Sequence, residues 1–302
     1  MQMTHVIINF RRHLKRRNLS KHTVKYYLNI IKQYVIWLDV ALEAANSDKV
    51  DTYIDYLLRK RMHPASINLY ITIIRMFYDY LKHEENVVIG NPVKRNRRLR
   101  VPKPLPRSLR DHEVEKLFEA IKSKRDMAMF KLMLRCGLRV EEVANLTMRA
   151  IDLNRRRIMV QQGKGGKDRV VYISSDALDA LNTYMEFRSH CRSKSVFLVE
   201  KGTYKGKGIS VRGIQKRIEY YAKQTGIEVS CHRLRHTMAT QLLNAEAEVE
   251  TIQDLLGHNW ITTTQRYCKV SNLKVQRDYF KAMRNVLQRS EQALPLYPFE
   301  PG

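Results

Sequence analysis

The chain has 302 residues and a hydrophobic fraction of 44%, which is enough for two folded domains that each bury a core. Its 55 lysines and arginines against 30 acidic residues give a formal charge of +25. This charge predicts a polyanionic partner, and nucleic acid is the first candidate. The simpler alternative is a charged surface that only keeps the protein in solution. No apolar run approaches the roughly 18 to 20 residues of a spanning helix, and the basic N-terminus is a poor signal peptide. A membrane-spanning or secreted protein is therefore disfavoured. An anionic membrane surface is a distant alternative as the binding partner.

Four helices are expected in residues 1–90, because apolar residues recur there at helical spacing. They are an amphipathic segment from Val6 to Leu14, a helix capped by Ser20, a third capped by Asp48 and a fourth opened by Pro64. The first 38 residues hold eight lysines and arginines and no acidic residue. We therefore expect a small all-α, four-helix domain that is basic along at least one edge.

A basic, proline-rich linker is expected over residues 91–107. The segment from residue 90 to 110 carries four prolines, eight basic residues and no acidic residue. Prolines keep such a segment extended and out of helices. A passive linker is the simpler interpretation, but a backbone this basic favours a path along DNA phosphates. The predicted DNA contacts are Lys94, Arg95, Arg97, Arg98, Arg100 and Lys103, with Lys167 from the hairpin described next.

Residues 108–290 alternate helix and strand signals, and residues 291–302 are expected to form a flexible tail. Gly137 is expected to stop a helix that carries Cys136. Ile158–Gln161 and Arg169–Ile173 predict two strands joined by a glycine-rich turn. Further helices are expected around Ala177–Phe187, Val211–Ala222, His232–Leu243, Val249–Leu256 and Leu273–Leu287. The predicted fold is thus mainly α with a small β-sheet: an α+β domain after an all-α one.

Two motifs of the second domain place cations where they bear on chemistry. Arg139 comes two residues after Gly137; by itself a surface position is the simpler interpretation, and Glu142 could be its partner or orient it. His232 and Arg235 are three residues apart, so on a helix they share a face. Beside a phosphate this pair could supply a proton-transfer group and a fixed positive charge, whereas a basic solvent face is the simpler alternative.

Two further motifs carry a tyrosine and a pair of lysines. Gly257 ends a predicted helix, His258 follows it, and Tyr267 lies nine residues later in a threonine-rich segment. The turn "GKGGKDR" offers Lys164 and Lys167. It could cradle a phosphate, but it lacks the Ser/Thr and the following helix of a Walker loop. A lysine at a hairpin tip also suits a proton donor that swings into place.

Together, "GLRVEEVANL", "GKGGKDR", "HRLRHTMATQLL" and "LLGHNWITTTQRY" resemble the motifs of the tyrosine recombinases, also called phage-type integrases, in order and spacing. The resemblance covers about residues 107–290. The all-α part is similar to the SAM-like core-binding domain of the family, and the layout resembles the two-domain form of the Xer proteins, without an arm-binding extension. The ordered set of Arg139, His232, Arg235, His258 and Tyr267, with a lysine hairpin between, is highly specific.

Two departures from the family pattern touch helix starts and no matched catalytic position. Relatives often carry proline where Cys231 stands, which weakens that helix-start signal. They commonly carry a Ser/Thr cap where Arg110 stands, and Asp111 is expected to act as the cap instead.

The resemblance implies the nucleophile and the anion-binding groups. Tyr267 would attack the phosphodiester and form a 3′-phosphotyrosine intermediate, which stores the bond energy so that rejoining needs no ATP. Arg139 and Arg235 would hold the phosphate oxygens as negative charge builds.

It also implies the groups that move protons. Lys164 would be the general acid for the departing 5′ oxygen, with Lys167 as the alternative, better suited to a backbone contact. His232 would assist proton transfer at Tyr267 or position the phosphate, and His258 would donate a hydrogen bond to a phosphate oxygen.

The partners implied by the resemblance are double-stranded DNA with a specific core site and three further copies of the chain. A homo-tetramer on two DNA sites would exchange strands through a Holliday junction, in integration, excision or resolution. A second recombinase or an accessory protein is a further candidate partner. Leu273–Leu287 and the tail are candidates for docking on a neighbouring protomer, and no membrane is expected.

Cysteine usage and ligand spacing predict a reduced, cytoplasmic protein without a cofactor. Cys136, Cys191, Cys231 and Cys268 are widely spaced, which favours neither a disulfide framework nor a zinc site. No carboxylate cluster or His/Cys grouping suggests a metal, so catalysis is expected to survive a chelator.

Two other functions stay open on the residues alone. A type IB-like topoisomerase would nick and reseal DNA without exchanging partners. A non-catalytic, sequence-specific DNA-binding protein would use residues 232–256 as a helix-turn-helix-like reader.

Overall fold

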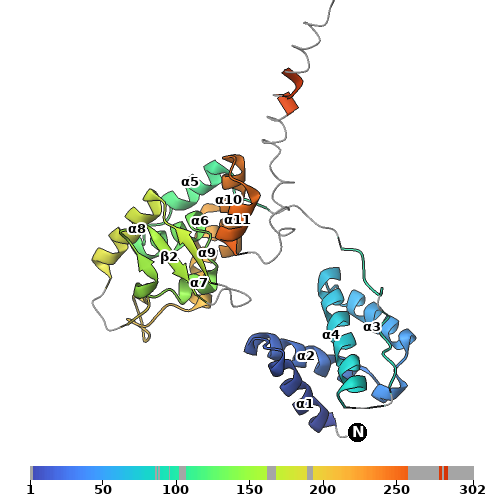
Figure 1. Cartoon of the computed structure of the whole chain (residues 1–302). Coiled ribbons are helices and arrows are strands. Elements are labelled where there is room, and N and C mark those ends of the chain that lie inside the picture. Colours follow the sequence, from blue (N-terminus) through green and yellow to red (C-terminus); the bar gives the residue numbers. More distant parts are fainter. Residues whose placement is uncertain are drawn as a thin grey trace, which may run out of the picture. The chain divides into compact units, whose positions relative to one another are not determined.

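The computed structural model describes residues 3–85, 87, 89–94, 96–101, 107–161, 168–188, 193–257, 279–280 and 282–284. The chain divides into two compact units, Met1–Lys103 and Pro104–Gly302 (Figure 1). Each unit has its own hydrophobic core. Within the described ranges, no helix is both long and apolar enough to span a bilayer.

The N-terminal unit is the expected set of four helices. They are α1 (Met3–Arg16), α2 (Lys21–Trp37), α3 (Ser47–Arg59) and α4 (Pro64–His83), with a short 3₁₀ turn, η1 (Leu42–Ala44), between α2 and α3. Ser20 caps α2 as predicted, because its hydroxyl accepts the Thr23 N–H at 3.1 Å. The predicted cap of α3 is wrong: Asn46 accepts the Lys49 N–H, and Asp48 lies inside the first turn.

Aromatic side chains hold these helices together. Phe10 of α1 packs edge-on against Phe77 of α4, with ring centroids 5.0 Å apart, and both are fully buried. Tyr34 of α2 and Tyr78 of α4 join their buried hydroxyls at 3.3 Å, and Tyr78 donates to the Leu42 carbonyl. The polar ends of the buried tyrosines are thus satisfied inside the core.

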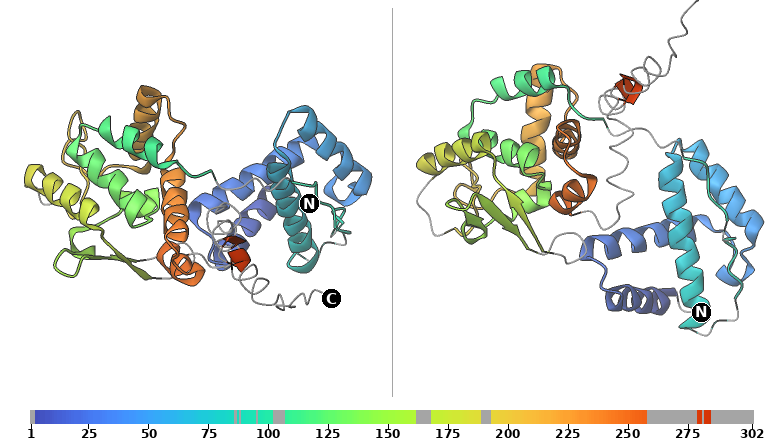
Figure 2. Two further views of the ribbon diagram at one scale, coloured as in Figure 1. Left: turned by 90° about the horizontal axis from the view of Figure 1, so that it is seen from above. Right: turned by 45° about the horizontal axis from the view of Figure 1, so that its top comes forward.

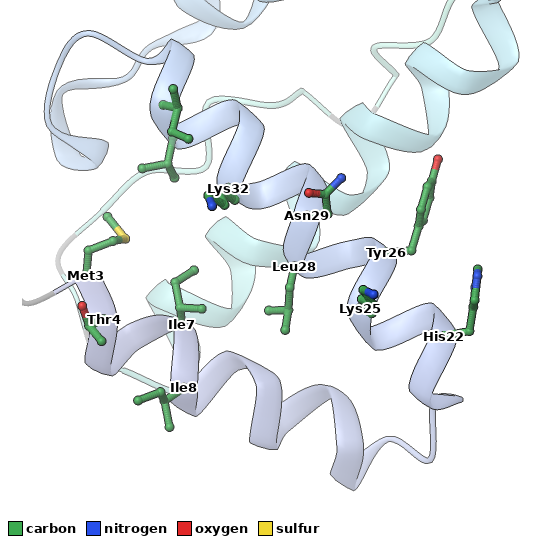
Figure 3. A pocket seen from close by; sticks show the side chains of 12 residues that line it. Met3, Thr4, Ile7, Ile8, His22, Lys25, Tyr26, Leu28, Asn29 and Lys32 are labelled. Atoms are coloured by element: carbon green, nitrogen blue, oxygen red, sulfur yellow. The ribbon is translucent and has the colours of Figure 1, made fainter.

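An open groove runs between α1 and α2 on the surface of this unit (Figure 3). Ile7, Ile8 and Leu28 form its apolar lining, and Lys25 and Lys32 line it as well. Ile8 is 45% exposed, so part of the apolar face of α1 lies open to solvent.

Residues 91–94 and 96–101 of the predicted linker pack on the N-terminal unit. The Asn68 side chain accepts the Leu99 N–H at 2.8 Å and donates to the Leu99 carbonyl at 2.9 Å. Arg97 forms an ion pair with Asp51 of α3. The exposed predicted DNA contacts of this segment are Lys94, Arg98 and Arg100. Contacts with α3 and α4 therefore turn part of this segment inward, while Lys94, Arg98 and Arg100 face solvent.

The C-terminal unit is a helical layer with a small antiparallel sheet (Figure 2). Its helices are α5 (Asp111–Glu119), α6 (Lys124–Arg135), α7 (Val140–Ala144), α8 (Ser175–Phe187), α9 (Val211–Thr225), α10 (Cys231–Asn244) and α11 (Val249–Leu256), with the 3₁₀ turn η2 (Met148–Ala150). The strands are β1 (Ile151–Asp152), β2 (Arg157–Val160) and β3 (Arg169–Tyr172), in the order β1-β2-β3. The predicted fold class is confirmed.

The register of the sheet follows from which side chains are buried. Ile158 of β2 pairs with Val171 of β3, and both are fully buried against the helices. Met159 pairs with Val170, and both face outward. The predicted hairpin is thus confirmed to within one residue at each outer end, whereas β1 and α7 were not expected.

Two helix starts in this unit show how the departures from the family pattern are accommodated. Ser230 caps α10 by accepting the Arg233 N–H at 3.2 Å, so a proline at Cys231 is not needed. The prediction that Asp111 caps α5 is wrong. Glu113 accepts the Arg110 N–H at 2.7 Å, and Asp111 instead accepts from Gln241.

Of the helix expected over Leu273–Leu287, only residues 279–280 and 282–284 are described, and these are helical. The other residues of that segment lie outside the described residues.

Candidate active site

Three predicted catalytic residues lie in the described part of the chain: Arg139, His232 and Arg235. The others, Lys164, His258 and Tyr267, lie outside it, as do the predicted DNA contacts Arg95, Lys103 and Lys167. Arg139 and Arg235 come from different parts of the unit, yet both guanidiniums donate to one backbone carbonyl, that of Leu256 at the end of α11. The structure thus brings the two predicted phosphate-binding cations together.

Arg235 lies on the buried face of α10, with 2% of its surface exposed. Its apolar neighbours Leu234, Met238 and Ala239 are buried too and draw this face of α10 into the core. The guanidinium donates to the carbonyls of Gly137 and Leu256. These two carbonyls fix the direction of the buried guanidinium.

Gly137 allows α6, α10 and α11 to meet at this point. Its φ of +64° is the left-handed conformation predicted for a residue that follows a helix end. A Cβ atom there would lie 3.1 Å from Leu256 Cδ2 and 3.1 Å from Met238 Sδ. A side chain at this position would be strained by the positive φ and would require the Leu256 and Met238 side chains to shift.

Arg139 is held by a carboxylate and by the end of α11. Its side chain is 22% exposed and its guanidinium lies 2.8 Å from Glu142 Oε1. It also donates to the carbonyls of Leu256 at 3.1 Å and Gly257 at 3.0 Å. The interpretation of Arg139 as a simple surface residue is wrong, and the expected pairing with Glu142 is confirmed.

Arg169, the first residue of β3, completes the cluster. Two of its nitrogens each lie 2.7 Å from an oxygen of Glu142, and its Nε donates to the Leu255 carbonyl at 2.8 Å. Its side chain is 9% exposed. Arg169 ends the motif "GKGGKDR" but was not among the predicted site residues, because the lysines of this motif are its more obvious candidates for chemistry.

The C-terminal end of α11 explains why arginines gather here. The last carbonyls of a helix have no partner within the helix and carry the negative end of the helix dipole. At Leu255, Leu256 and Gly257 these carbonyls accept from three guanidiniums. The bonded cluster of Arg139, Arg169, Arg235 and Glu142 holds three positive charges and one negative, so it favours an added anion such as a phosphate.

The pKa of the Glu142 carboxyl reflects this surplus of positive charge. Burial raises the pKa, but hydrogen bonds from the Arg169 side chain and from the Arg139 backbone and side chain outweigh burial and lower it to about 2. The carboxylate therefore stays ionised throughout the neutral range and holds both arginines.

Acid should weaken the fold through this group. Because the folded pKa lies below the unfolded one, the contribution of Glu142 to stability is complete above the ordinary carboxyl pKa and is lost as the pH falls from there towards 2. We expect the pH-dependent part to be on the order of 3 kcal/mol. Unfolding free energies of the native protein and Glu142→Gln, measured from pH 7 to pH 2, should converge at the acid end. A constant gap across that range would contradict the prediction.

His232 lies in the first turn of α10 and is exposed, whereas Arg235 points into the core. The spacing of three residues therefore does not give the two side chains the same surroundings. The His232 ring packs against the His236 ring, with centroids 4.1 Å apart and planes at 75°. The His232 imidazole therefore lies on the solvent-facing side of α10, whereas Arg235 lies on its buried side.

The described residues contain no group of three or more His, Cys, Asp or Glu side chains that could hold a metal ion. Cys136 and Cys231 are free and buried, and burial raises the pKa of these thiols to about 12 and about 11. Neither thiol is therefore a ready nucleophile at neutral pH.

Known proteins share both units. Residues 107–274 match the model of the phage integrase family, and residues 7–86 match the model of the phage integrase N-terminal SAM-like domain. The tyrosine recombinase XerA of Thermococcus kodakarensis is 32% identical over 268 residues, 88% of this chain and 91% of that protein. The tyrosine recombinase XerC of Staphylococcus aureus is 31% identical over 302 residues, 96% of this chain and all of that protein.

Among solved structures, the integrase of transposon Tn1549 in complex with circular intermediate DNA matches with a TM-score of 0.72 at 17% identity, over 87% of this chain and 94% of that one. At this identity the match concerns the fold alone. The sequence matches and the described cluster define an integrase-type protein. The chain belongs to the phage integrase family, and its curated relatives are tyrosine recombinases.

Proposed function

We propose that this protein is a site-specific DNA recombinase that cuts and rejoins strands through a 3′-phosphotyrosine intermediate, without metal or ATP. The observation that carries the proposal is the convergence of Arg139 and Arg235 on the Leu256 carbonyl, two residues before His258. Two guanidiniums fixed beside each other can hold two non-bridging oxygens of one phosphodiester.

The proposed reaction gives each of the predicted catalytic residues one role. The Tyr267 hydroxyl attacks the phosphorus and loses its proton, with His232 assisting, while the bond to the 5′ oxygen breaks and Lys164 gives that oxygen a proton. Arg139 and Arg235 hold the phosphate as its charge grows, and His258 donates a hydrogen bond to it. In the rejoining step a 5′ hydroxyl attacks the phosphotyrosine and releases Tyr267, so the number of phosphoester bonds is unchanged.

DNA is the proposed partner of both units. A formal charge of +25 and the exposed Lys94, Arg98 and Arg100 favour binding to a polyanion. Lambda integrase, which shares this fold, was solved as a dimer bound to a core site. We propose a core-binding domain (1–90), a linker (91–107) that also uses Arg95, Arg97 and Lys103, and a catalytic domain (108–290) that adds Lys167, with a C-terminal tail (291–302).

We further propose a homo-tetramer acting on two DNA sites, with a second recombinase or an accessory protein as an additional partner. A cytoplasmic location follows from a DNA substrate and is in keeping with the widely spaced cysteines of the sequence.

A suicide substrate tests the chemistry. Nicked duplexes from the DNA that flanks the gene, incubated with the protein in EDTA, should give an adduct that survives SDS. Mass spectrometry should place the 3′ phosphate on Tyr267. An adduct on another residue, or one that forms only with a divalent metal, would contradict the proposal.

Relaxation of plasmid DNA separates recombination from the topoisomerase alternative. A recombinase should give exchange products only when two sites are present. Relaxation of a supercoiled plasmid that lacks such sites, with no exchange on one that has them, would instead identify a topoisomerase.

A further inference from the structure

Arg169 joins three segments that are distant in the sequence. It starts β3, pairs with Val160 of β2, grips Glu142 in α7 through two nitrogens and binds the Leu255 carbonyl near the end of α11. We propose that Arg169 is a positioning residue for DNA cleavage, which acts through Glu142 on Arg139 and through Leu255 on the backbone that leads to His258. This role rests on the proposed function.

The first argument is that Arg169 completes the bonding of Glu142. Glu142 Oε1 accepts from Arg139 Nη1 at 2.8 Å and from Arg169 Nη1 at 2.7 Å. Its Oε2 accepts from the Arg139 N–H at 2.8 Å and from Arg169 Nη2 at 2.7 Å. A carboxylate has about four acceptor positions, so these four bonds fix its plane. Without Arg169, Glu142 can rotate, and the Arg139 guanidinium turns with it.

The second argument concerns the end of α11. Gly257 has φ +58°, and a Cβ atom there would lie 3.0 Å from Arg169 Cδ, so the arginine stem packs directly on this backbone. The Arg169 Nε holds the preceding carbonyl, that of Leu255. Arg169 therefore contacts the backbone on both sides of Leu256, at the end of α11.

The third argument is that the Arg169 side chain is more buried than that of Arg139. The Arg169 side chain is 9% exposed, whereas that of Arg139 is 22% exposed. Arg169 is therefore the more buried of the two arginines that bind Glu142. This arrangement suits a residue that orients a phosphate-binding arginine and does not itself contact the phosphate.

Arg125 provides a matched control in the same unit. Its side chain is also 9% exposed, and it binds Asp126 through two nitrogens, donates to the Leu198 carbonyl and lies 3.6 Å from a Glu200 oxygen. None of these groups belongs to the arginine cluster at α11. Arg125→Lys and Arg169→Lys thus make the same chemical change at equal burial, one away from the site and one within it.

The experiment compares single-turnover formation of the covalent adduct on a saturating suicide substrate, together with DNA affinity and melting temperature. We expect Arg169→Lys to bind DNA like the native protein and to form the adduct about 10- to 100-fold more slowly, because lysine keeps the charge but loses the fork. Arg125→Lys should lose comparable thermal stability and keep the native rate. A native rate in Arg169→Lys, or an equal slowing in both variants, overturns the proposal.

Two further measurements keep the test decisive. Should Arg169→Lys fail to fold, Arg169→Gln, which keeps a planar donor, is compared with Arg125→Gln in the same way.

A double-mutant cycle with Glu142→Gln should show strong non-additivity, which means that the double variant is little slower than the slower single variant. Additive slowing contradicts action through Glu142. A native protein that forms no adduct overturns the proposed function itself, whereas a fast adduct in Arg169→Lys overturns only this role.

Discussion

Tyr267→Phe is expected to abolish the covalent protein–DNA complex and to leave DNA binding intact. The change removes one hydroxyl oxygen, which is the atom that would bond to phosphorus, and keeps the aromatic ring. Loss of a nucleophile in a serine protease slows the reaction by about a millionfold, and we expect an effect of that order here. The measurement is the rate at which a labelled suicide substrate becomes resistant to SDS, alongside a gel-shift titration at fixed salt.

Tyr220→Phe is the control for this substitution. Tyr220 lies on α9 in the same unit and is 52% exposed, so its hydroxyl is removed without disturbing the core. This variant should form the adduct at the native rate. Survival of the adduct in Tyr267→Phe would exclude Tyr267 as the nucleophile and would favour a different tyrosine or a different reaction.

Elements whose signals are local could be predicted from the sequence. The β2–β3 hairpin follows from alternating burial around a glycine-rich turn, and it lies within one residue of its predicted outer ends. Gly137 was predicted to end a helix, and it has the positive φ that this position requires. The cap of α3 was misassigned because Asn46 and Asp48 are both good caps two residues apart, and only the backbone geometry separates them.

The cluster itself could be predicted only in part, because its contacts are long-range. Arg139 and Glu142 are three residues apart, so their pairing could be anticipated from spacing. Arg169 is 27 residues from Glu142 and 86 from Leu255, and no periodicity links them. The family resemblance predicts which residues would contact DNA. The backbone carbonyls that accept hydrogen bonds from the arginines could not be predicted in this way, because every residue has a carbonyl.

The linker shows the same limit. Its composition predicted an extended basic segment, and Arg98 and Arg100 are exposed as such a segment would require. Its docking depends on two bonds between Asn68 and Leu99, which are 31 residues apart. The composition of a segment indicates what it can bind. A single asparagine on a helix, such as Asn68, does not indicate that its side chain will bind the backbone of a residue as distant as Leu99.

Arg235→Lys is expected to slow adduct formation by roughly a hundred- to a thousandfold while DNA binding is retained. Loss of one preorganised donor to a developing oxyanion typically raises the barrier by about 3 to 4 kcal/mol. Lysine keeps the positive charge, but a single ammonium is a poor replacement for a planar fork that spans the carbonyls of Gly137 and Leu256. The lysine ammonium could not donate to both carbonyls at once, so the cation would no longer be held beside Arg139 at the shared Leu256 carbonyl.

Arg233→Lys distinguishes this loss of alignment from a general loss of charge on α10. Arg233 lies on the same helix, two residues earlier, and also donates to two backbone carbonyls, those of Glu228 and Ser108. It contacts no member of the arginine cluster within the described residues, so its substitution should lower thermal stability without slowing the chemical step. Equal slowing in both variants would mean that α10 needs its charges to fold or to bind DNA. A defect confined to Arg235→Lys would mean that the direction of the Arg235 guanidinium, set by Gly137 and the end of α11, is what cleavage requires.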